Sequence, residues 1–229
     1  MRLILASASP RRAELLRAAG YEFDVVAGDV DESIRDGEAP ALYVRRLAAD
    51  KSAAAIRLIV SARRSSDGPA KAGHYGDDDG PPNGGHYEKI GSDDDVIVLG
   101  ADTTVVVDGE ILAKPRDDGD AAAMMRRIAG RVHEVLTGVS LRRGGFEVGR
   151  VETTRVHVAP LTDDEIAWYV ATGEGQDKAG AYAIQGVASR FIPRIEGSYS
   201  NVVGLPVACV RELLTEISGI PPGRSSPRR

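Results

Sequence analysis

Two serines and two arginines follow a short apolar run near the start of the chain. The run covers residues 3–6, and Ser7, Ser9, Arg11 and Arg12 come directly after it. We expect a buried strand and then a helix that begins at the proline after Ser9, because serine is a favoured N-cap and proline fits the first helical position. Such a turn offers free N–H groups and the positive end of a helix dipole, which attract anions. Guanidinium groups and hydroxyls suit phosphate oxygens, although an ordinary capped helix with two solvated arginines would show the same residues.

The second candidate is Asp102, in the stretch Gly-Ala-Asp-Thr-Thr that covers residues 100–104. The apolar residues 96–100 predict a strand, and α/β folds place their ligand crevice at the ends of such strands. A carboxylate there could coordinate Mg²⁺ or take a proton from an attacking water. The alternative is a turn aspartate that bonds to its own backbone. Lys114 closes the hairpin expected over residues 103–113, so its ammonium either returns towards Asp102 or is solvated.

A third cluster covers residues 178–186, Lys-Ala-Gly-Ala-Tyr-Ala-Ile-Gln-Gly, where small residues allow close approach of the backbone. Lys178 supplies a cation and Gln185 an amide. The amide offers both a donor and an acceptor, as pairing with the imide edge of a uracil or thymine ring requires. A surface glutamine without a ligand is the alternative. The polar run 196–201 either lines the same site or forms a turn.

The elements that must position these residues alternate along the first half of the chain. Strands are expected at 22–26, 96–100, 103–107 and 110–113, and helices at 10–20, from about residue 40 through Lys51, and at 117–129. A long hairpin is expected from residues 132–141 and 146–158, a helix after the capping box at 162–165, and a last helix at 205–218. This order predicts an α/β protein with a mixed sheet in one elongated domain.

Residues 65–95 interrupt this pattern. They are rich in Gly, Pro and Asp and hold eight acids and two lysines, which contribute −6 to the net charge of −5 and leave +1 for the rest of the chain. We expect this stretch to be an acidic, disordered insertion in a single domain that spans residues 1–218, followed by a flexible tail at 219–229.

The composition excludes several classes of protein. Of the 229 residues, 42% are hydrophobic, which is enough for a sizeable core, and the single cysteine, Cys209, excludes an internal disulfide and is expected to be buried. The near-neutral body has no basic stripe suited to nucleic acid. No apolar run reaches the ~20 residues of a membrane span or resembles a secretory signal. We therefore expect a cytoplasmic protein with no nucleic-acid or membrane partner.

Four stretches in order carry a resemblance to a known family. They are Ser-Ala-Ser-Pro-Arg-Arg at 7–12, Gly-Ala-Asp-Thr at 100–103, Ala-Lys-Pro at 113–115 and the cluster at 178–186. Together they resemble the Maf family of nucleoside triphosphate pyrophosphatases, over nearly the whole chain outside the insertion and the tail. The resemblance implies a mixed twisted sheet with flanking helices and a central cleft, similar to that of the ITP pyrophosphatases, in a homodimer. It also implies hydrolysis of a nucleoside triphosphate to the monophosphate and pyrophosphate with a divalent metal cation, Mg²⁺ or Mn²⁺.

The resemblance also assigns roles to single residues. Asp102 would be the general base or a metal ligand, and Glu32 would share the metal. Three residues would bear on base choice, namely Arg11, Thr103 and Gln185. Four would hold phosphates, namely Arg12, Lys51, Lys114 and Lys178.

The motifs look like the branch of the family that acts on dTTP and UTP, and the imide argument for Gln185 supports the same substrates. Two features depart from the family pattern: the insertion at 65–95, and Ala113 where the family usually has glycine.

Two other functions remain open at this point. One is a non-enzymatic regulator of cell division that binds nucleotides or proteins, although a binding module needs no carboxylate directed at a bound polyanion. The other is a purine-directed pyrophosphatase that removes ITP or XTP on a similar fold, which substrate selectivity would distinguish.

Overall fold

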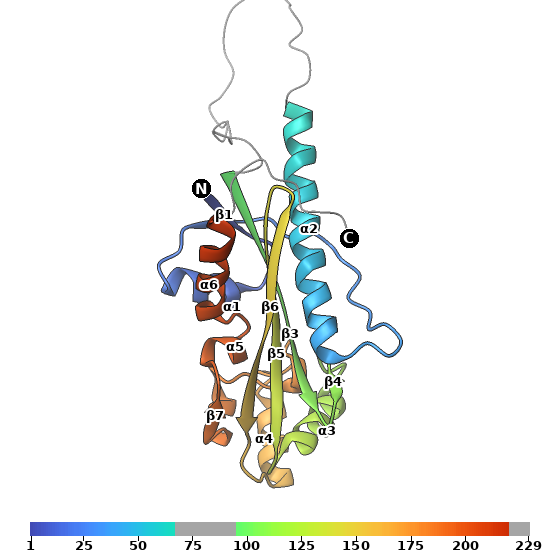
Figure 1. The fold of residues 1–229 in the computed structure, drawn as a ribbon. Helices are drawn as coiled ribbons and strands as arrows, with labels where there is room; N and C mark the ends of the chain where they lie inside the picture. Colours follow the sequence, from blue (N-terminus) through green and yellow to red (C-terminus); the bar gives the residue numbers. More distant parts are fainter. Residues whose placement is uncertain (67–94, 220–229) are drawn as a thin grey trace, which may run out of the picture.

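The computed structural model describes residues 1–66 and 95–219 (Figure 1). Seven strands form one sheet in the order β2-β1-β3-β5-β6-β7, with β4 paired to β3. β1 is parallel to β2 and β3, and the other pairings are antiparallel. The strands are β1 (Arg2–Leu5), β2 (Phe23–Val25), β3 (Val96–Val107), β4 (Glu110–Leu112), β5 (Val132–Arg143), β6 (Phe146–His157) and β7 (Arg194–Glu196). The predicted α/β class with a mixed sheet is confirmed.

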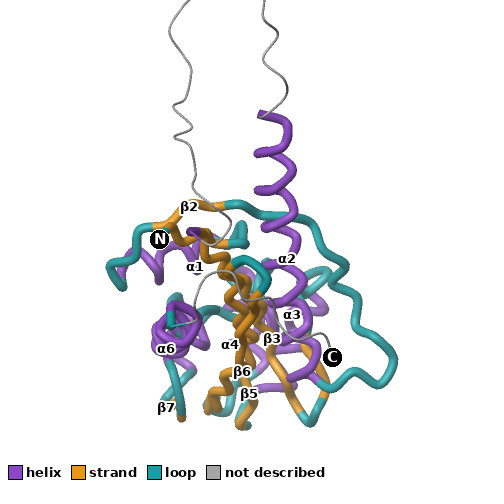
Figure 2. Tube along the Cα trace, turned by 45° about the horizontal axis from the view of Figure 1, so that its top comes forward, coloured by secondary structure: helices purple, strands orange, loops and turns teal. Residues whose placement is uncertain are grey.

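Helices flank the sheet on both sides. The α2 helix lies along one side, and α1, α5 and α6 lie along the other (Figures 1 and 2). The helices are α1 (Pro10–Ala18), α2 (Pro40–Ser66), α3 (Asp118–Ile128), α4 (Asp163–Ala171), α5 (Tyr199–Val203) and α6 (Val207–Ser218), with short 3₁₀ helices η2 (Ala179–Ala181) and η3 (Val187–Phe191). In the described ranges, no helix combines the length and the apolar character needed to cross a membrane.

The side chains of β1 and β3 alternate between two cores because successive residues of a strand point to opposite faces. Leu5 and Leu99 pack with α1 and α6, whereas Ile4 and Val98 pack with α2. By the same alternation Asp102 faces α2, and Thr103 faces α1 and α5. Cys209 is buried in the core beside α1, as expected.

The prediction that the third strand would stop before Asp102 was wrong. β3 is one strand of 12 residues. Its antiparallel partner β5 pairs with it from Val98 to Val106, which carries the strand through the small and polar residues. The parallel neighbour β1 ends opposite Leu99. Asp102 therefore lies beyond the end of β1, in the middle of its own strand.

Close packing of α2 on β3 fixes the position of Asp102. Gly100 lies so near the helix that a Cβ atom there would be 2.2 Å from the carbonyl oxygen of Ala48 and 2.7 Å from the amide nitrogen of Ser52. Only glycine allows this approach. The next turn of the helix brings Lys51 over Asp102.

Most other elements agree with the predictions. The long hairpin of β5 and β6 is present, and the capping box at Thr162 and Glu165 begins α4. The polar run at 196–201 forms the end of β7 and the start of α5, where Ser198 is the N-cap. Residues 65 and 66 continue α2, whereas the rest of the predicted insertion up to residue 94, and the tail from residue 220, lie outside the described residues.

Candidate active site

A cleft of about 930 Å³ opens where β1 ends beside β3. Its walls are the turn between β1 and α1, the segment 27–34, the middle of β3, and the segment 177–185. Every residue that the sequence analysis gave a role lines this cleft: Ser7, Ser9, Arg11, Arg12, Glu32, Lys51, Asp102, Thr103, Lys114, Lys178 and Gln185. The polar run at 196–201 is not part of its lining. The fold therefore brings together motifs that are as much as 178 positions apart, from residue 7 to residue 185.

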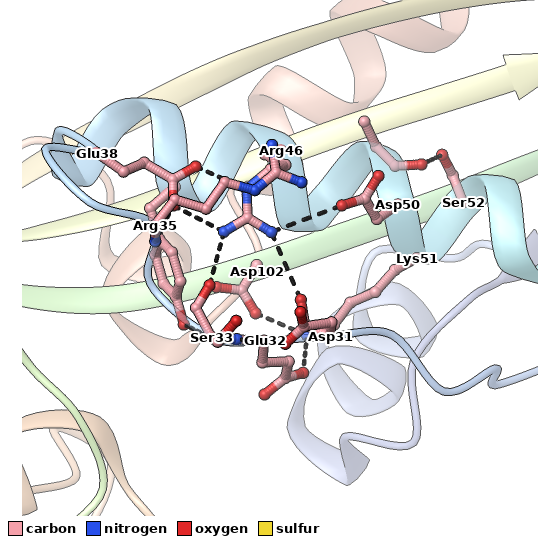
Figure 3. A network of polar contacts seen from close by, with 12 residues as sticks. Asp31, Glu32, Ser33, Arg35, Glu38, Arg46, Asp50, Lys51, Ser52 and Asp102 are labelled. Carbon is pink, nitrogen blue, oxygen red and sulfur yellow. Dashed lines mark hydrogen bonds and ion pairs between the residues drawn. The ribbon is translucent and has the colours of Figure 1, made fainter.

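Asp102 forms the centre of the cleft floor. The residue is buried, with only 8% of its surface exposed. The ammonium of Lys51 on α2 donates to its Oδ1 atom at 2.7 Å and lies 2.6 Å from Oε1 of Glu32 (Figure 3). One lysine thus joins a buried carboxylate of the sheet to a carboxylate of the loop above it.

The loop that carries Glu32 is held by Arg46 of α2. The guanidinium binds both carboxylate oxygens of Glu38, at 2.6 and 2.7 Å, and donates to the backbone carbonyl of Ser33 at 2.9 Å (Figure 3). The hydrogen bonds and charge of Arg46 lower the pKa of Glu38 to about 2, so the pair stays ionised at neutral pH. This pair closes the loop onto the helix that also carries Lys51.

Arg12 forms a second part of the floor, and its guanidinium is largely engaged with the protein. It donates to the carbonyl of Gly204 at 2.9 Å, to the hydroxyl of Ser7 at 3.0 Å and to the hydroxyl of Thr103 at 3.2 Å. The Thr103 hydroxyl also lies 2.9 Å from that of Thr137 on β5. Five N–H groups are available on an arginine, so donors remain for a ligand in the cleft. We use "floor" for Arg12, Lys51, Asp102 and Thr103.

Burial and neighbouring charges have opposite effects on the pKa values of the two carboxylates in the cleft, Asp102 and Glu32. Burial raises the pKa of Asp102, against the effect of Lys51 and Arg12. Burial alone would raise the pKa of Glu32 as well, but the hydrogen bond and charge of Lys51 reverse the shift and lower it. Burial, together with both carboxylates, raises the pKa of Tyr43 to about 12. Its protonated hydroxyl donates to the backbone carbonyl of Glu32 at 3.0 Å.

We use "rim" for Arg11, Lys114, Asp177, Lys178 and Gln185, which come from loops and, in the case of Arg11, from the first turn of α1. Asp177 is 71% exposed; it pairs with Lys178 and lies 3.4 Å from a terminal nitrogen of Arg11. Lys114 and Gln185 are exposed. Asp177 and Tyr43 were missed by the sequence analysis. The first could have been suspected from its place beside Lys178, whereas nothing in the sequence distinguishes Tyr43 from a surface tyrosine.

The turn before α1 has the predicted form. The helix begins at Pro10, and Ser9 is its N-cap residue, although its side chain makes no capping hydrogen bond. The backbone N–H of Ser9 instead donates to the hydroxyl of Ser7 at 3.3 Å. Both serines line the cleft.

The carboxylates of Asp102 on the floor and Glu32 on the loop fit a divalent cation. In residues 1–66 and 95–219, no three side chains of His, Cys, Asp or Glu are grouped as metal ligands. Glu32 and Asp102 nevertheless direct one oxygen each at the same positive charge, the Lys51 ammonium. Proteins often bind Mg²⁺ through one or two carboxylates, with substrate phosphates completing the shell. The pair therefore suits an ion that arrives with a polyphosphate.

Comparisons with a family model and with individual proteins point to the same family. The family model described as "Maf-like protein" matches residues 2–217. The chain is 45% identical over 214 residues to a dTTP/UTP pyrophosphatase of Koribacter versatilis, a match that covers 93% of each protein. It is 44% identical over 217 residues to the dTTP/UTP pyrophosphatase of Hahella chejuensis, over 94% of this chain and 92% of that one. It is also 44% identical over 222 residues to the one of Geobacter sulfurreducens, over 96% and 98%.

Proposed function

This chain belongs to the family of Maf-like proteins, and we propose that it is a dTTP/UTP pyrophosphatase whose active site is the cleft above Asp102. The observation that carries the proposal is a buried carboxylate among five cationic side chains, which are Arg11, Arg12, Lys51, Lys114 and Lys178. Such an excess of positive charge suits a triphosphate. The similarity to pyrophosphatases of three organisms supports the choice of substrates.

Asp102 is the residue that activates water. It accepts the proton of a water molecule whose oxygen attacks the α-phosphorus of the nucleotide. The new bond joins water oxygen to the α-phosphorus, and the bond from that phosphorus to the bridging oxygen breaks. Pyrophosphate leaves with the bonding electrons, and the nucleoside monophosphate remains. Phosphoryl chemistry of this kind depends mainly on position and on electrostatic stabilisation.

The cations of the cleft stabilise the charge that moves onto the leaving group. Lys51 holds Asp102 in place and keeps its charge balanced in a buried position. Lys114 and Lys178 approach from the rim, where they can bind the outer phosphates. Arg12 supplies remaining N–H donors from the floor, and its three protein contacts fix their direction.

A divalent cation, Mg²⁺ or Mn²⁺, held by Asp102 and Glu32 would supply further charge neutralisation for the triphosphate. Base choice rests with Gln185 and Arg11 at the rim and with Thr103, which acts through its contact with Arg12. We also propose assembly as a homodimer in the cytoplasm, which rests on the family resemblance.

Pyrophosphate release from a panel of nucleotides tests the function. The panel consists of dTTP, UTP, CTP, ITP, XTP and 7-methyl-GTP with Mg²⁺ or Mn²⁺. We expect dTTP and UTP to be hydrolysed with a kcat/KM about tenfold or more above the others, which corresponds to about 1.4 kcal/mol of discrimination. Preference for a purine nucleotide would contradict the substrate assignment, and no release from any nucleotide would contradict the enzymatic function.

A further inference from the structure

Glu174, in the turn after α4, binds two consecutive backbone N–H groups of the segment that follows Gln185. Its Oε2 atom accepts the N–H of Val187 at 2.6 Å, and its Oε1 atom accepts the N–H of Ala188 at 3.1 Å. Oε1 also accepts the hydroxyl of the buried Tyr169, at 3.1 Å. One half-buried carboxylate thus joins helix α4 to the first N–H groups of η3. Hydrogen bonds to a charged acceptor are stronger than neutral ones.

The carboxylate also lies against Gly186, the residue that follows Gln185. A Cβ atom at this glycine would be 1.8 Å from Oε2 of Glu174 and 2.4 Å from the carboxylate carbon. Glycine is needed here because any side chain would displace the carboxylate. The contact therefore fixes the backbone directly behind Gln185.

Gln185 depends on this backbone for its position. The side chain is exposed at the rim. Before it, the chain is held by the hydrogen bond from the Gly186 N–H to the carbonyl of Ala183, at 3.2 Å. After it, the anchor is Glu174. Glu174 itself does not line the cleft, so it can influence a ligand only through the segment that it holds.

We propose that Glu174 is a positioning residue for base selection, which it exerts by fixing residues 185–188 so that the Gln185 amide faces the nucleotide base. The inference rests on the proposed function, because it assumes that the base lies at Gln185. A glutamine amide selects between bases only when its donor and acceptor are held in register with the ring edge.

The test compares Glu174→Gln with a matched control, Glu165→Gln. Glu165 caps the other end of α4 through the N–H and hydroxyl of Thr162, away from the cleft. For each enzyme, kcat/KM is measured with UTP and CTP, and amide hydrogen exchange is followed over residues 184–188. We expect Glu174→Gln to reduce the UTP/CTP ratio about tenfold, chiefly through KM for UTP, and to speed exchange at Val187 and Ala188. Glu165→Gln should change neither.

A positioning role and a merely structural role of Glu174 predict different results. A Glu174→Gln enzyme that melts earlier but keeps the wild-type UTP/CTP ratio overturns the inference, since Glu174 would then be only structural. If that variant does not fold, Gly186→Ala displaces the same carboxylate and should lower the ratio. A wild-type enzyme without preference for UTP contradicts the proposed function instead. The positioning role would then be judged by hydrogen exchange alone. Amide exchange at Val187 and Ala188 that is the same in Glu174→Gln as in the wild type would overturn it.

Discussion

The floor of the cleft and its rim are held in different ways. Floor residues lie on the sheet and on α2 and α1, and the buried Asp102 and Arg12 form hydrogen bonds with other residues of the protein. The other rim residues lie on loops, with Arg11 at the start of α1, and rim side chains make partly exposed ion pairs, such as that between Arg11 and Asp177. Exposed ion pairs contribute ~0–1 kcal/mol, whereas removal of one partner of a buried charged contact costs several times more.

This difference indicates that the floor and the rim have different roles in catalysis and in binding. The floor fixes the reactive carboxylate and cannot move without loss of packing. The rim can exchange its internal ion pairs for contacts with phosphates or a base. Substitutions in the floor should therefore abolish turnover or destabilise the fold, and substitutions in the rim should alter KM and selectivity.

The largest effect is expected for Asp102→Asn. Asparagine has nearly the same shape and keeps an oxygen for Lys51, but it is not a base. We expect kcat for dTTP to fall by about 10²–10⁴-fold, with a melting temperature close to that of the wild type. Steady-state pyrophosphate release and thermal unfolding measure the two quantities. A variant with near-normal kcat would remove Asp102 from catalysis.

Adjacent arginines offer the sharpest comparison of floor with rim. A lysine at position 12 cannot reach Gly204, Ser7 and Thr103 at once. We expect Arg12→Lys to lower the free energy of unfolding by about 2 kcal/mol. The control Arg11→Lys should change it by less than about 0.5 kcal/mol. Urea unfolding of both variants decides this, and equal losses would show that floor and rim do not differ.

His133 on β5 makes the stability of the fold depend on pH. It is 2% exposed, and its Nε2 atom lies 2.8 Å from the hydroxyl of Tyr182, which lines the cleft. Burial lowers the pKa of His133 from 6.5 to about 4. Because the folded pKa is the lower one, the neutral histidine stabilises the fold fully above pH 6.5. This contribution is lost progressively as the pH falls towards 4.

The expected loss is about 2 kcal/mol between pH 7.5 and pH 5. Urea unfolding gives the free energy of unfolding of the wild type and of His133→Gln at both pH values. The contribution of His133 is the difference between the two proteins in how much this free energy falls from pH 7.5 to pH 5. His157→Gln is the control, because His157 is less buried and paired with Glu196 at 2.9 Å. Identical pH dependence in the wild type and His133→Gln would rule out the buried histidine as the source.

The smallest effect is expected for a substitution at the rim, and it should improve substrate binding, whereas the substitutions above impair activity or stability. Asp177 competes with the triphosphate for Arg11 and Lys178. Asp177→Asn should therefore lower KM for dTTP about twofold, an effect that shrinks at high salt. Initial rates at low and high ionic strength measure it. A raised KM would show that Asp177 helps to bind the substrate rather than competing with it.

The sequence located the motifs of the cleft better than it located their places in the fold. Ser7, Arg12 and Gln185 could be proposed because their side chains suit phosphate or an imide at any position. The place of Asp102 was predicted wrongly, because small and polar neighbours predict a turn unless the partner strand is known. Pairing with β5, about 35 residues further on, is a long-range property that no local pattern contains.

Contacts between elements far apart in the chain could not be predicted from the sequence either. Lys51 entered only through the family resemblance, since a lysine within an amphipathic helix is usually solvated. The roles of Arg46 and Glu174 depend on loops that fold back onto helices, and neither residue stands in a recognisable motif. Glycine at positions 100 and 186 was visible, but the reason for it required the neighbouring backbone and carboxylate.

Hydrolysis of dTTP in H₂¹⁸O tests the central claim most directly. Attack of water on the α-phosphorus in the cleft predicts that ¹⁸O appears in dTMP and not in pyrophosphate, and that Asp102→Asn slows the appearance of labelled dTMP by the same factor as kcat. Label in pyrophosphate would mean attack at the β-phosphorus, and label in orthophosphate would mean stepwise removal of phosphate. Either result would contradict the proposed pyrophosphatase mechanism.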